Sequence, residues 1–557
     1  MNYPSRLVFG IALLVALSVI FVERLPAAPT PRAILPTMTP VDAERVQADA
    51  EAAERAGKWD RALDHYFKLY SNGHNTTELR DRIRYCLRNA SQIHRHRDPA
   101  FQQFILSLSP SDSLNLYVEA ITKMHTLYTD RQKASVDRLF LNGLQELDRA
   151  IMDPAFRLAH MPEVNELKLT KFRELIREGW QQKLPNTPRE ARLAAREVLA
   201  AAQSQLGMKN GSALVLEFLC GACAGLDEYS SYQTATGAGE MIGHPVLELA
   251  AFGMLVTLEN GLVVDGMIPG SWAARHTTLK KGDRIVTLNG KDMTKATGLA
   301  FAAAVKVPLT PTGHEIEVPT TLIAQATTQK IRLPLPVPSV YATEMIGTRE
   351  GIGYVRVSMF KESTAREMDD AVEALKLRGL RGLVIDLRGN AGGSFQAAVD
   401  LSKRFLASGV IVTTHGQIQE FANGIYPADA MTVYDMPVVL LVDTRTMSAA
   451  EVFAAALKDN DRATLIGMTT FGKGLIQCPV RLRALDGDDA RSNKSGHLLL
   501  SVGSAFGPRG NALNGTGIAP HVIEPDAARH VELAISKLTD LLGPAAMTMT
   551  LPTDMMH

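Results

Sequence analysis

Two short apolar runs constrain the fold of this 557-residue chain more than any other feature. Residues 382–388 and 437–443 are dominated by Val, Leu and Ile, and each run precedes a segment that favours a helix. Strands that are apolar along nearly their whole length are typical of a largely buried sheet. Because strand and helix patterns alternate from about residue 346 onward, we predict an α/β layer arrangement for this part of the chain.

The rest of the chain divides by residue pattern into regions of other kinds. Apolar residues recur at three- and four-residue spacing in residues 41–225, which predicts helices. Short β-rich runs alternate with turn residues in 246–337, which predicts a small β domain. After residues 1–30 we therefore expect a multidomain α+β protein with a helical N-terminal region at 31–185, a helical segment and linker at 186–245, the β domain at 246–337, an α/β core at 338–535 and a disordered tail at 536–557.

The helical region begins with a pattern that occurs in repeat proteins. Residues 57–70 resemble the first helix of a tetratricopeptide unit, but no clear second copy follows. We therefore expect a helical bundle, with a repeat-type surface for a protein partner as the alternative. His94 and His96 stand among arginines with no cluster of carboxylates or cysteines nearby, so we expect a solvated helix end rather than a metal site.

The first 30 residues differ in composition from the rest of the chain. Arg6 precedes an uncharged, mostly apolar run at 7–22, which Glu23, Arg24 and a stretch rich in Pro and Ala follow. The run is intermediate in length between the core of a signal peptide and a full membrane span. We expect residues 1–30 to be a signal peptide or an uncleaved membrane anchor. The protein is then exported, periplasmic or otherwise extracytoplasmic, with residues 7–22 in the membrane if the segment is retained.

Charge and composition argue against several classes of ligand. Lys plus Arg equal Asp plus Glu at 59 each, so no overall positive field favours a nucleic-acid partner. Residues 467–473 match the start of a phosphate-binding Walker loop, but Gly474 stands where Ser or Thr is needed for Mg²⁺. We expect no cofactor and no metal. Since the chain has only 4 cysteines, an exported form must be held together by packing rather than by disulfides.

Ser448 and Lys473 lie in segments that suit nucleophilic catalysis. Ser448 precedes a run of strong helix formers, and the free N–H groups at a helix N-terminus favour an oxyanion. Plain capping of the helix by Ser448 is the alternative. A serine hydroxyl needs a base, and Lys473 lies in a glycine-flanked apolar segment where burial would lower its pKa. Gln477 follows four residues later and is placed to hydrogen-bond the amine.

A glycine-rich segment follows the first apolar run. Residues 386–394 contain Gly389, Gly392 and Gly393, and glycines allow a backbone to approach a ligand closely. The segment lies at the end of a predicted strand, where active-site loops of open α/β folds collect.

The β domain carries a second recognisable pattern. Residues 279–290 resemble the PDZ pattern, in which a Gly-Asp turn leads into a strand that ends in Asn-Gly. PDZ domains bind an extended C-terminal peptide as an added strand, and backbone N–H groups of a loop hold its carboxylate. The loop and strand in this chain would be Phe252, Gly253, Met254 and Leu255. A small β-barrel without a ligand is the alternative.

Together these segments resemble the C-terminal processing peptidases, also called tail-specific proteases, which are PDZ-containing serine endopeptidases with a Ser/Lys dyad. The resemblance runs from roughly 114 to 525 and leaves the preceding helical residues outside it. It rests on Ser-x-x-Glu at 448–451, Phe-Gly-Lys-Gly at 471–474 with Gln477, the Asp-Leu-Arg-Gly-Asn-Ala-Gly-Gly run at 386–393, the segment 226–232 and Gly-Thr-Gly-Ile-Ala-Pro at 515–520.

The resemblance implies a role for each matching residue. Ser448 would be the nucleophile, Lys473 the general base and Gln477 the residue that orients the lysine. The oxyanion hole would come from backbone N–H groups of Ala449 and of Gly392 or Gly393. The implied fold is a PDZ-like β domain joined to a crotonase-like α/β protease core.

The expected function is cleavage of proteins or peptides that carry free C-termini, and the helical region is a candidate surface for a further protein partner. The chain departs from the family where Ala391 replaces a common Pro, where Glu228-Tyr229 replace Pro-His, and at Met447. None of these changes removes a reacting atom. The alternative is a catalytically silent PDZ and helical-repeat scaffold that binds protein C-termini.

Overall fold

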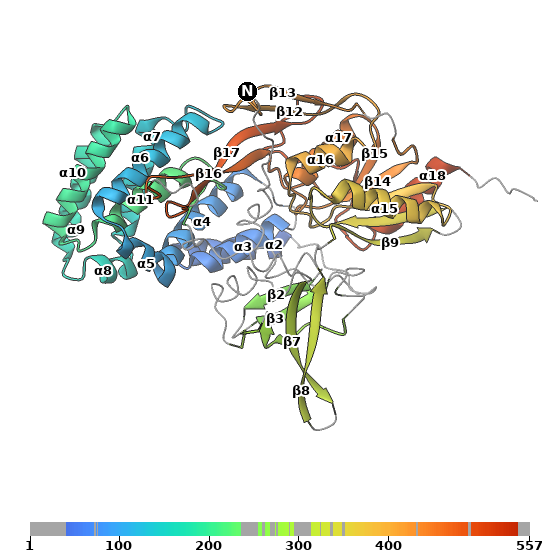
Figure 1. Ribbon diagram of the computed structural model, residues 1–557, viewed down its shortest axis with the longest axis horizontal. Helices are drawn as coiled ribbons and strands as arrows, with labels where there is room; N and C mark the ends of the chain where they lie inside the picture. Colours follow the sequence, from blue (N-terminus) through green and yellow to red (C-terminus); the bar gives the residue numbers. More distant parts are fainter. Residues whose placement is uncertain are drawn as a thin grey trace, which may run out of the picture.

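The computed structural model describes residues 40–71, 74, 76–234, 254–258, 262–267, 273, 277–288, 290–294, 313–322, 325–334, 338–347, 351–429, 433–487 and 492–543. Figure 1 shows a helical region, a small β domain and a mixed α/β part, with the N-terminal helices between them. The predicted order of a helical region, a small β domain and an α/β core is confirmed. The expected signal peptide or anchor lies outside the described residues.

Three N-terminal helices form a small unit with its own core. They are α2 (Pro40–Arg55), α3 (Trp59–Ser71) and α4 (Thr77–Arg97). Their apolar faces meet in a cluster that includes Leu63, Tyr66 and Cys86. The segment expected to resemble a tetratricopeptide helix is therefore helical and packs against its sequence neighbours.

A larger bundle follows, as its helical periodicity predicts. Its helices are α5 (Pro99–Ser107), α6 (Pro110–Leu127), α7 (Val136–Ala150), α8 (Pro154–His160), α9 (Glu166–Glu174), α10 (Pro188–Leu206) and α11 (Gly211–Ala224), with short turns η1 (Leu175–Gly179) and η2 (Trp180–Gln182). Helix α11 is buried along nearly its whole length because α6, α7 and α10 surround it. Cys220 and Cys223 lie on this helix, and both are buried free thiols.

Buried ion pairs attach α4 to the bundle. Arg95 of α4 donates to Glu217 of α11 at 3.1 Å, and His96 Nε2 lies 2.8 Å from the same carboxylate. Burial by itself raises the pKa of Glu217, but Arg95 and His96 together outweigh burial and lower that pKa. The expectation of a solvated helix end is wrong for His96, which is buried, because α11 supplies a partner that the local sequence does not reveal.

The β domain consists of two small sheets. One has the strand order β2-β3-β4 and the other β6-β5-β7-β8. Their bounds are β2 (Met254–Leu258), β3 (Leu262–Met267), β4 (Arg284–Ile285), β5 (Thr287–Leu288), β6 (Lys291–Asp292), β7 (Gly313–Leu322) and β8 (Gln325–Pro334). Among the strands that the structure describes, β2 has β3 as its only neighbour, so β2 forms an edge of its sheet.

A six-stranded sheet forms the centre of the α/β core. Its order is β18-β15-β14-β11-β10-β9, and all pairs are parallel except β9 with β10. The strands are β9 (Val340–Gly347), β10 (Ile352–Val357), β11 (Gly382–Asp386), β14 (Val438–Val442), β15 (Ala463–Gly467) and β18 (Val522–Ile523). Both predicted apolar runs, β11 and β14, lie at the centre and are fully buried.

Helices cover both faces of this sheet, as its apolar strands require. One face packs on α15 (Thr364–Lys376), α16 (Phe395–Ser402) and α17 (Ala449–Asp459). The other face packs on α18 (His530–Leu542) through Ala534 and Leu538. These contacts carry α18 past residue 536, where the tail was expected to begin.

A second sheet links the core to the helical bundle. Its order is β1-β17-β12-β13, and β16 also pairs with β17. The strands are β1 (Ser231–Gln233), β12 (Val410–Gly416), β13 (Gly424–Pro427), β16 (Leu475–Arg481) and β17 (His497–Phe506). β1 and β16 pair with the two edges of β17. The segment before β1 comes close to β16, because Tyr229 packs against Leu475 and its carbonyl oxygen accepts a hydrogen bond from Gln477. Within the described part of the chain, no helix combines the length and apolar composition that crossing a membrane needs.

Candidate active site

Ser448 lies in a strained turn between β14 and α17. Its backbone has φ 58° and ψ −122°, a region that residues other than glycine rarely adopt. The Ser448 N–H donates to Oε2 of Glu451 at 2.9 Å, so a carboxylate in the first turn of α17 holds the turn in place. The serine is only partly buried and stands at the N-terminal end of an otherwise buried helix. Strained residues of this kind are frequent at active sites.

The glycine-rich loop after β11 lies directly against Ser448. A Cβ atom on Gly392 would stand 2.7 Å from the Ser448 Cβ and 3.0 Å from the Ala449 nitrogen. A Cβ on Gly393 would stand 2.1 Å from the carbonyl oxygen of Phe360. The structure therefore brings Ser448, Ala449 and the Gly392-Gly393 pair together, and only glycine fits the two loop positions. Their role as an oxyanion hole stays a prediction.

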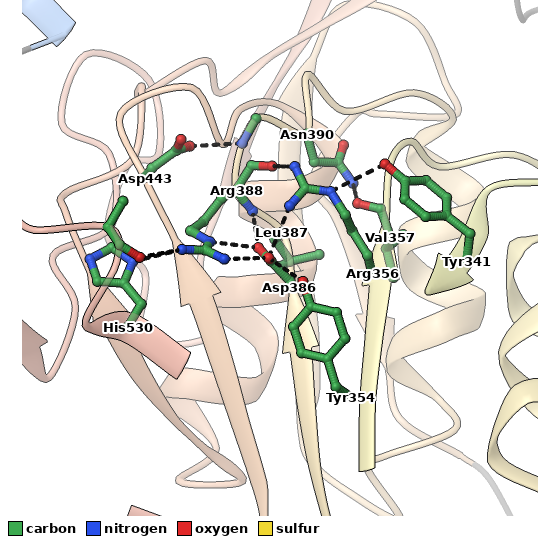
Figure 2. A network of polar contacts seen from close by, with 12 residues as sticks. Tyr341, Tyr354, Arg356, Val357, Asp386, Leu387, Arg388, Asn390, Asp443 and His530 are labelled. Carbon is green, nitrogen blue, oxygen red and sulfur yellow. Dashed lines mark hydrogen bonds and ion pairs between the residues drawn. The ribbon is translucent and has the colours of Figure 1, made fainter. Parts of the chain in front are cut away.

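A buried polar network supports this loop (Figure 2). Asp386, at the end of β11, accepts hydrogen bonds from Tyr354 Oη at 2.6 Å, Arg388 Nη2 at 2.7 Å and Arg356 Nη1 at 2.9 Å. Burial by itself raises the pKa of Asp386, but the two arginines outweigh it and hold the pKa well below its usual range. Arg356 also donates to the carbonyl oxygen of Arg388 at 2.6 Å, which fixes the first residues of the loop.

The same network reaches the turn that carries the serine. Figure 2 shows Asn390 within the loop after β11 and Asp443 on the neighbouring segment after β14. Asn390 donates from Nδ2 to the Val357 carbonyl at 2.9 Å, and its own carbonyl accepts from the Met447 N–H at 2.9 Å. Asp443 accepts from the Gly389 N–H at 2.9 Å. The loop and the Ser448 turn are therefore joined by hydrogen bonds on two sides.

Glu451 holds the loop that carries Lys473. Its buried carboxylate accepts hydrogen bonds from Thr470 Oγ1 at 2.5 Å, from the Gly472 N–H at 2.6 Å and from the Lys473 N–H at 2.7 Å. Burial raises the pKa of Glu451, and these hydrogen bonds oppose that rise. The sequence pattern Ser-x-x-Glu signals a helix cap. It does not reveal that the glutamate also binds the Lys473 loop, which follows the next strand, β15.

The Lys473 side chain is buried and lies over an aromatic ring. Its exposed fraction is 4%, and its Nζ stands 4.4 Å from the ring centroid of Tyr229. Burial lowers the pKa of Lys473 to about 8, although the nearby Asp227, Glu228 and Glu451 oppose this change. A lysine with such a pKa is partly neutral near physiological pH, which a general base requires.

Gln477 contacts Tyr229. Its Nε2 donates to the Tyr229 carbonyl oxygen at 2.9 Å, so it binds the residue whose ring covers the lysine. Among the residues that the structure describes, no hydrogen bond joins Lys473 Nζ to Gln477 or to Ser448 Oγ. The direct contacts expected for both pairs stay predictions. The sequence did not indicate a role for Tyr229, since its ring meets the lysine only in the folded chain.

The predicted peptide-binding residues lie in part within the described chain. Met254 and Leu255 begin β2, and Met254 is buried. Phe252 and Gly253 lie outside the described residues.

Comparisons with known proteins identify the family of the chain. The profile of peptidase family S41 matches residues 351–523, and the PDZ domain profile matches 242–309. The carboxy-terminal-processing protease of Bartonella bacilliformis is 30% identical over 318 residues, which cover 56% of this chain and 69% of that relative. The carboxy-terminal processing protease CtpA of Bacillus subtilis is 31% identical over 300 residues, which cover 53% of this chain and 60% of that relative.

A third relative, the carboxyl-terminal-processing protease of Synechocystis sp., is 34% identical over 244 residues, which cover 41% of this chain and 54% of that protein. The chain thus spans less than two thirds of the length of the Bacillus and Synechocystis relatives. The solved structure of the photosystem II D1 C-terminal processing protease is 22% identical, covers 75% of this chain and 94% of its own, and has a TM-score of 0.39. By its matching regions and its relatives, the chain belongs to peptidase family S41, as a PDZ-containing serine-type peptidase of the C-terminal processing group.

Proposed function

We propose that this protein is an endopeptidase that binds the C-terminal tail of a protein substrate at its PDZ domain and cleaves peptide bonds with Ser448 and Lys473. One observation carries the proposal: Glu451 Oε2 accepts the backbone N–H groups of both residues, at 2.9 and 2.7 Å. A shared carboxylate keeps the two chain segments next to each other. The lowered pKa of Lys473 supports its role as the base.

In the proposed reaction, neutral Lys473 takes the hydroxyl proton of Ser448 while Oγ attacks the scissile carbonyl carbon. The N–H groups of Ala449 and of the Gly392-Gly393 pair stabilise the oxyanion. Collapse of the intermediate breaks the peptide bond, the ammonium returns its proton to the leaving amine, and an acyl-enzyme remains. Water then hydrolyses the ester with Lys473 again as the base. Since Nζ lies over Tyr229 in this structure, the cycle includes a movement of the lysine side chain toward Ser448.

The PDZ domain supplies the proposed binding site for the substrate tail. Strand β2 has β3 as its only described neighbour, so the other edge of β2 offers backbone groups for an added peptide strand. We assign the peptide to Met254 and Leu255 on this edge and its carboxylate to the preceding Phe252 and Gly253. The substrates are thus proteins or peptides with free C-termini.

The location of the protein is proposed from its N-terminal residues. Residues 7–22 suit export or membrane attachment, which would place the peptidase outside the cytoplasm. Cell fractionation of the full chain, followed by N-terminal sequencing, tests this: a cytosolic protein with an intact N-terminus contradicts it.

Hydrolysis of an unfolded protein with an apolar C-terminal tail tests the proposed activity. Ser448→Ala and Lys473→Ala are each expected to lower the rate by roughly 10⁴-fold, as removal of other serine nucleophiles does. Amidation of the substrate's C-terminus is expected to raise KM, because it removes the carboxylate that the PDZ loop binds. Equal rates for wild type and both variants would exclude the dyad. Tail binding without any cleavage by wild type would favour the silent scaffold.

A further inference from the structure

Two residues of the N-terminal helices contact the loop that carries Lys473. Tyr70 of α3 donates from Oη to the carbonyl oxygen of Phe471 at 2.9 Å, and Arg80 of α4 donates from Nη2 to the same oxygen at 2.9 Å. The rings of Tyr70 and Phe471 also pack, with centroids 5.3 Å apart. Both helices lie outside the regions that match the peptidase and PDZ families, 351–523 and 242–309.

Helix α4 also contacts the segment that covers the lysine amine. Arg84 pairs with Glu228 at 3.2 Å, directly before Tyr229. Leu87 of the same helix packs against the cluster formed by Tyr229 and Leu475. The N-terminal helices therefore touch both segments that surround Lys473, the one on which its backbone lies and the one that covers its amine.

Helix α3 packs on α4, and α4 is firmly attached to the bundle. Arg88 of α4 pairs with the buried Glu146 of α7 at 2.8 Å, and Arg95 pairs with Glu217 of α11. Buried pairs of this kind are costly to break, because one partner is left as an uncompensated charge. Tyr70 and Arg80 thus donate their hydrogen bonds from helices that the bundle holds in place.

We propose that Tyr70 and Arg80 are positioning residues of the active site, which hold the Phe471 carbonyl so that the Lys473 loop keeps its catalytic geometry. The loop is held from opposite sides: Glu451 binds the N–H groups of Gly472 and Lys473, and the N-terminal helices bind the carbonyl before them. Without these donors the partly buried carbonyl loses its partners and the loop shifts to recover them. The inference rests on the proposed function of Lys473. It assigns α3 and α4, which lie before the family region, a role in positioning the catalytic loop.

The test compares Tyr70→Phe, Arg80→Gln and the double variant with wild type. Tyr70→Phe removes the hydroxyl donor, and Arg80→Gln removes the guanidinium that reaches the Phe471 carbonyl; both keep most of the side chain's volume. We expect kcat of the double variant to fall by about 10- to 100-fold, since a displacement near 1 Å is enough to cost that much. KM should stay within about twofold, because the substrate tail binds at the PDZ domain. Arg80→Lys, which keeps a charged donor, should restore part of the lost kcat.

Arg82→Gln is the matched control. Arg82 lies on the same helix, its side chain is 53% exposed, and it pairs with Glu54 inside the N-terminal unit at 2.7 Å. Its replacement removes the same charge from α4 without touching the Lys473 loop, so kcat should equal that of wild type. A loss in the control as large as that in Arg80→Gln would show a general effect of the helix and overturn the proposal.

Hydrogen exchange separates this inference from the proposed function. In the double variant, the Gly472 and Lys473 amides should exchange about tenfold faster than in wild type, while the amides of β14 should not change. If wild type shows no Ser448-dependent hydrolysis but this local change appears, the proposed function fails and the positioning contact stands. Unchanged kcat together with unchanged exchange overturns the inference. Should the double variant not fold, Tyr70→Phe alone, which loses one hydroxyl, decides by the same two measurements.

Discussion

The backbone N–H groups of Ser448 and Lys473 donate to the same oxygen of Glu451, at 2.9 and 2.7 Å. A strained helix N-terminus and a loop that follows a separate strand are thereby tied to one buried carboxylate. Its second oxygen accepts from Thr470 and Gly472. Glu451 therefore holds the backbones of the two proposed catalytic residues next to each other.

Replacement of Glu451 should damage both stability and activity. Glu451→Gln puts an amide donor against N–H groups that need an acceptor, so buried donors are left without partners. We expect the free energy of unfolding to fall by about 2 kcal/mol or more and hydrolysis to fall with it. Urea unfolding and initial rates measure the two effects. Glu373→Gln, an exposed site on α15, is the control and should change neither. If Glu451→Gln is as stable as wild type, the carboxylate does not hold the Ser448 turn and the Lys473 loop together.

The pH dependence of hydrolysis should report Lys473. Only the neutral amine accepts the serine proton, so kcat/KM is expected to rise with pH to a plateau with an apparent pKa about 8, well below the ordinary 10.5 of lysine. Asp227, Glu228 and Glu451 are the carboxylates that face the lysine and oppose the lowering. Initial rates between pH 6 and pH 10, at about constant ionic strength, measure the profile. A midpoint near the ordinary value would contradict a buried lysine base.

Stability should follow the same group. Because the folded pKa of about 8 lies below the ordinary 10.5, the unfolded chain binds more protons between these values. The free energy of unfolding is therefore expected to rise with pH across this window. Lys473→Met lacks the titrating amine, so its unfolding should lose this part of the pH dependence. Identical slopes for the two proteins in urea unfolding at several pH values would refute the assignment.

Gly392→Ala should abolish hydrolysis through a steric clash. The added Cβ would stand 2.7 Å from the Ser448 Cβ, so the turn or the loop must move. Gly379→Ala is the matched control, because Gly379 also has a positive φ, 86° against 99°, but nothing lies within 4 Å of its built Cβ. The control carries the backbone strain alone and should keep near wild-type rates. Similar rates for the two variants would show that the close approach has no catalytic importance.

Asp386→Asn should destabilise the core and weaken hydrolysis. The variant leaves Arg356 and Arg388 as buried cations with a neutral partner. Loss of one member of a buried ion pair lowers the free energy of unfolding by about 3 kcal/mol. Asp429→Asn removes an exposed carboxylate that pairs with Lys403 and should have little effect on either property. Thermal unfolding and initial rates measure both variants. A stable but inactive Asp386→Asn would show that the network acts mainly on the loop.

Much of the fold follows from local sequence patterns. The apolar runs of β11 and β14 and the small-residue run of α17 predicted their own secondary structure, because buried strands and helices need those residues wherever they occur. The candidate site was found for a related reason. Ser448, Lys473 and the glycine pair are each marked by local composition, and their order along the chain matches a family.

Other parts of the site have no local signal. His96 was expected in solvent because arginines flank it, yet Glu217 from a helix far along the chain makes it part of a buried network. Gln477 donates to the Tyr229 carbonyl oxygen, a partner from a segment far before it in the chain. In each case the partner comes from a distant segment, so no window of sequence contains both groups.

The sequence by itself determined which residues have reactive groups and which segments form strands and helices. Side-chain chemistry and the periodicity of burial are properties of short stretches, so they can be read locally. Only the tertiary structure decided that Tyr229 covers the amine of Lys473 and that Tyr70 and Arg80 hold the Phe471 carbonyl. Those contacts depend on how the N-terminal helices and the second sheet pack on the core, since packing alone brings residues hundreds of positions apart within hydrogen-bond reach.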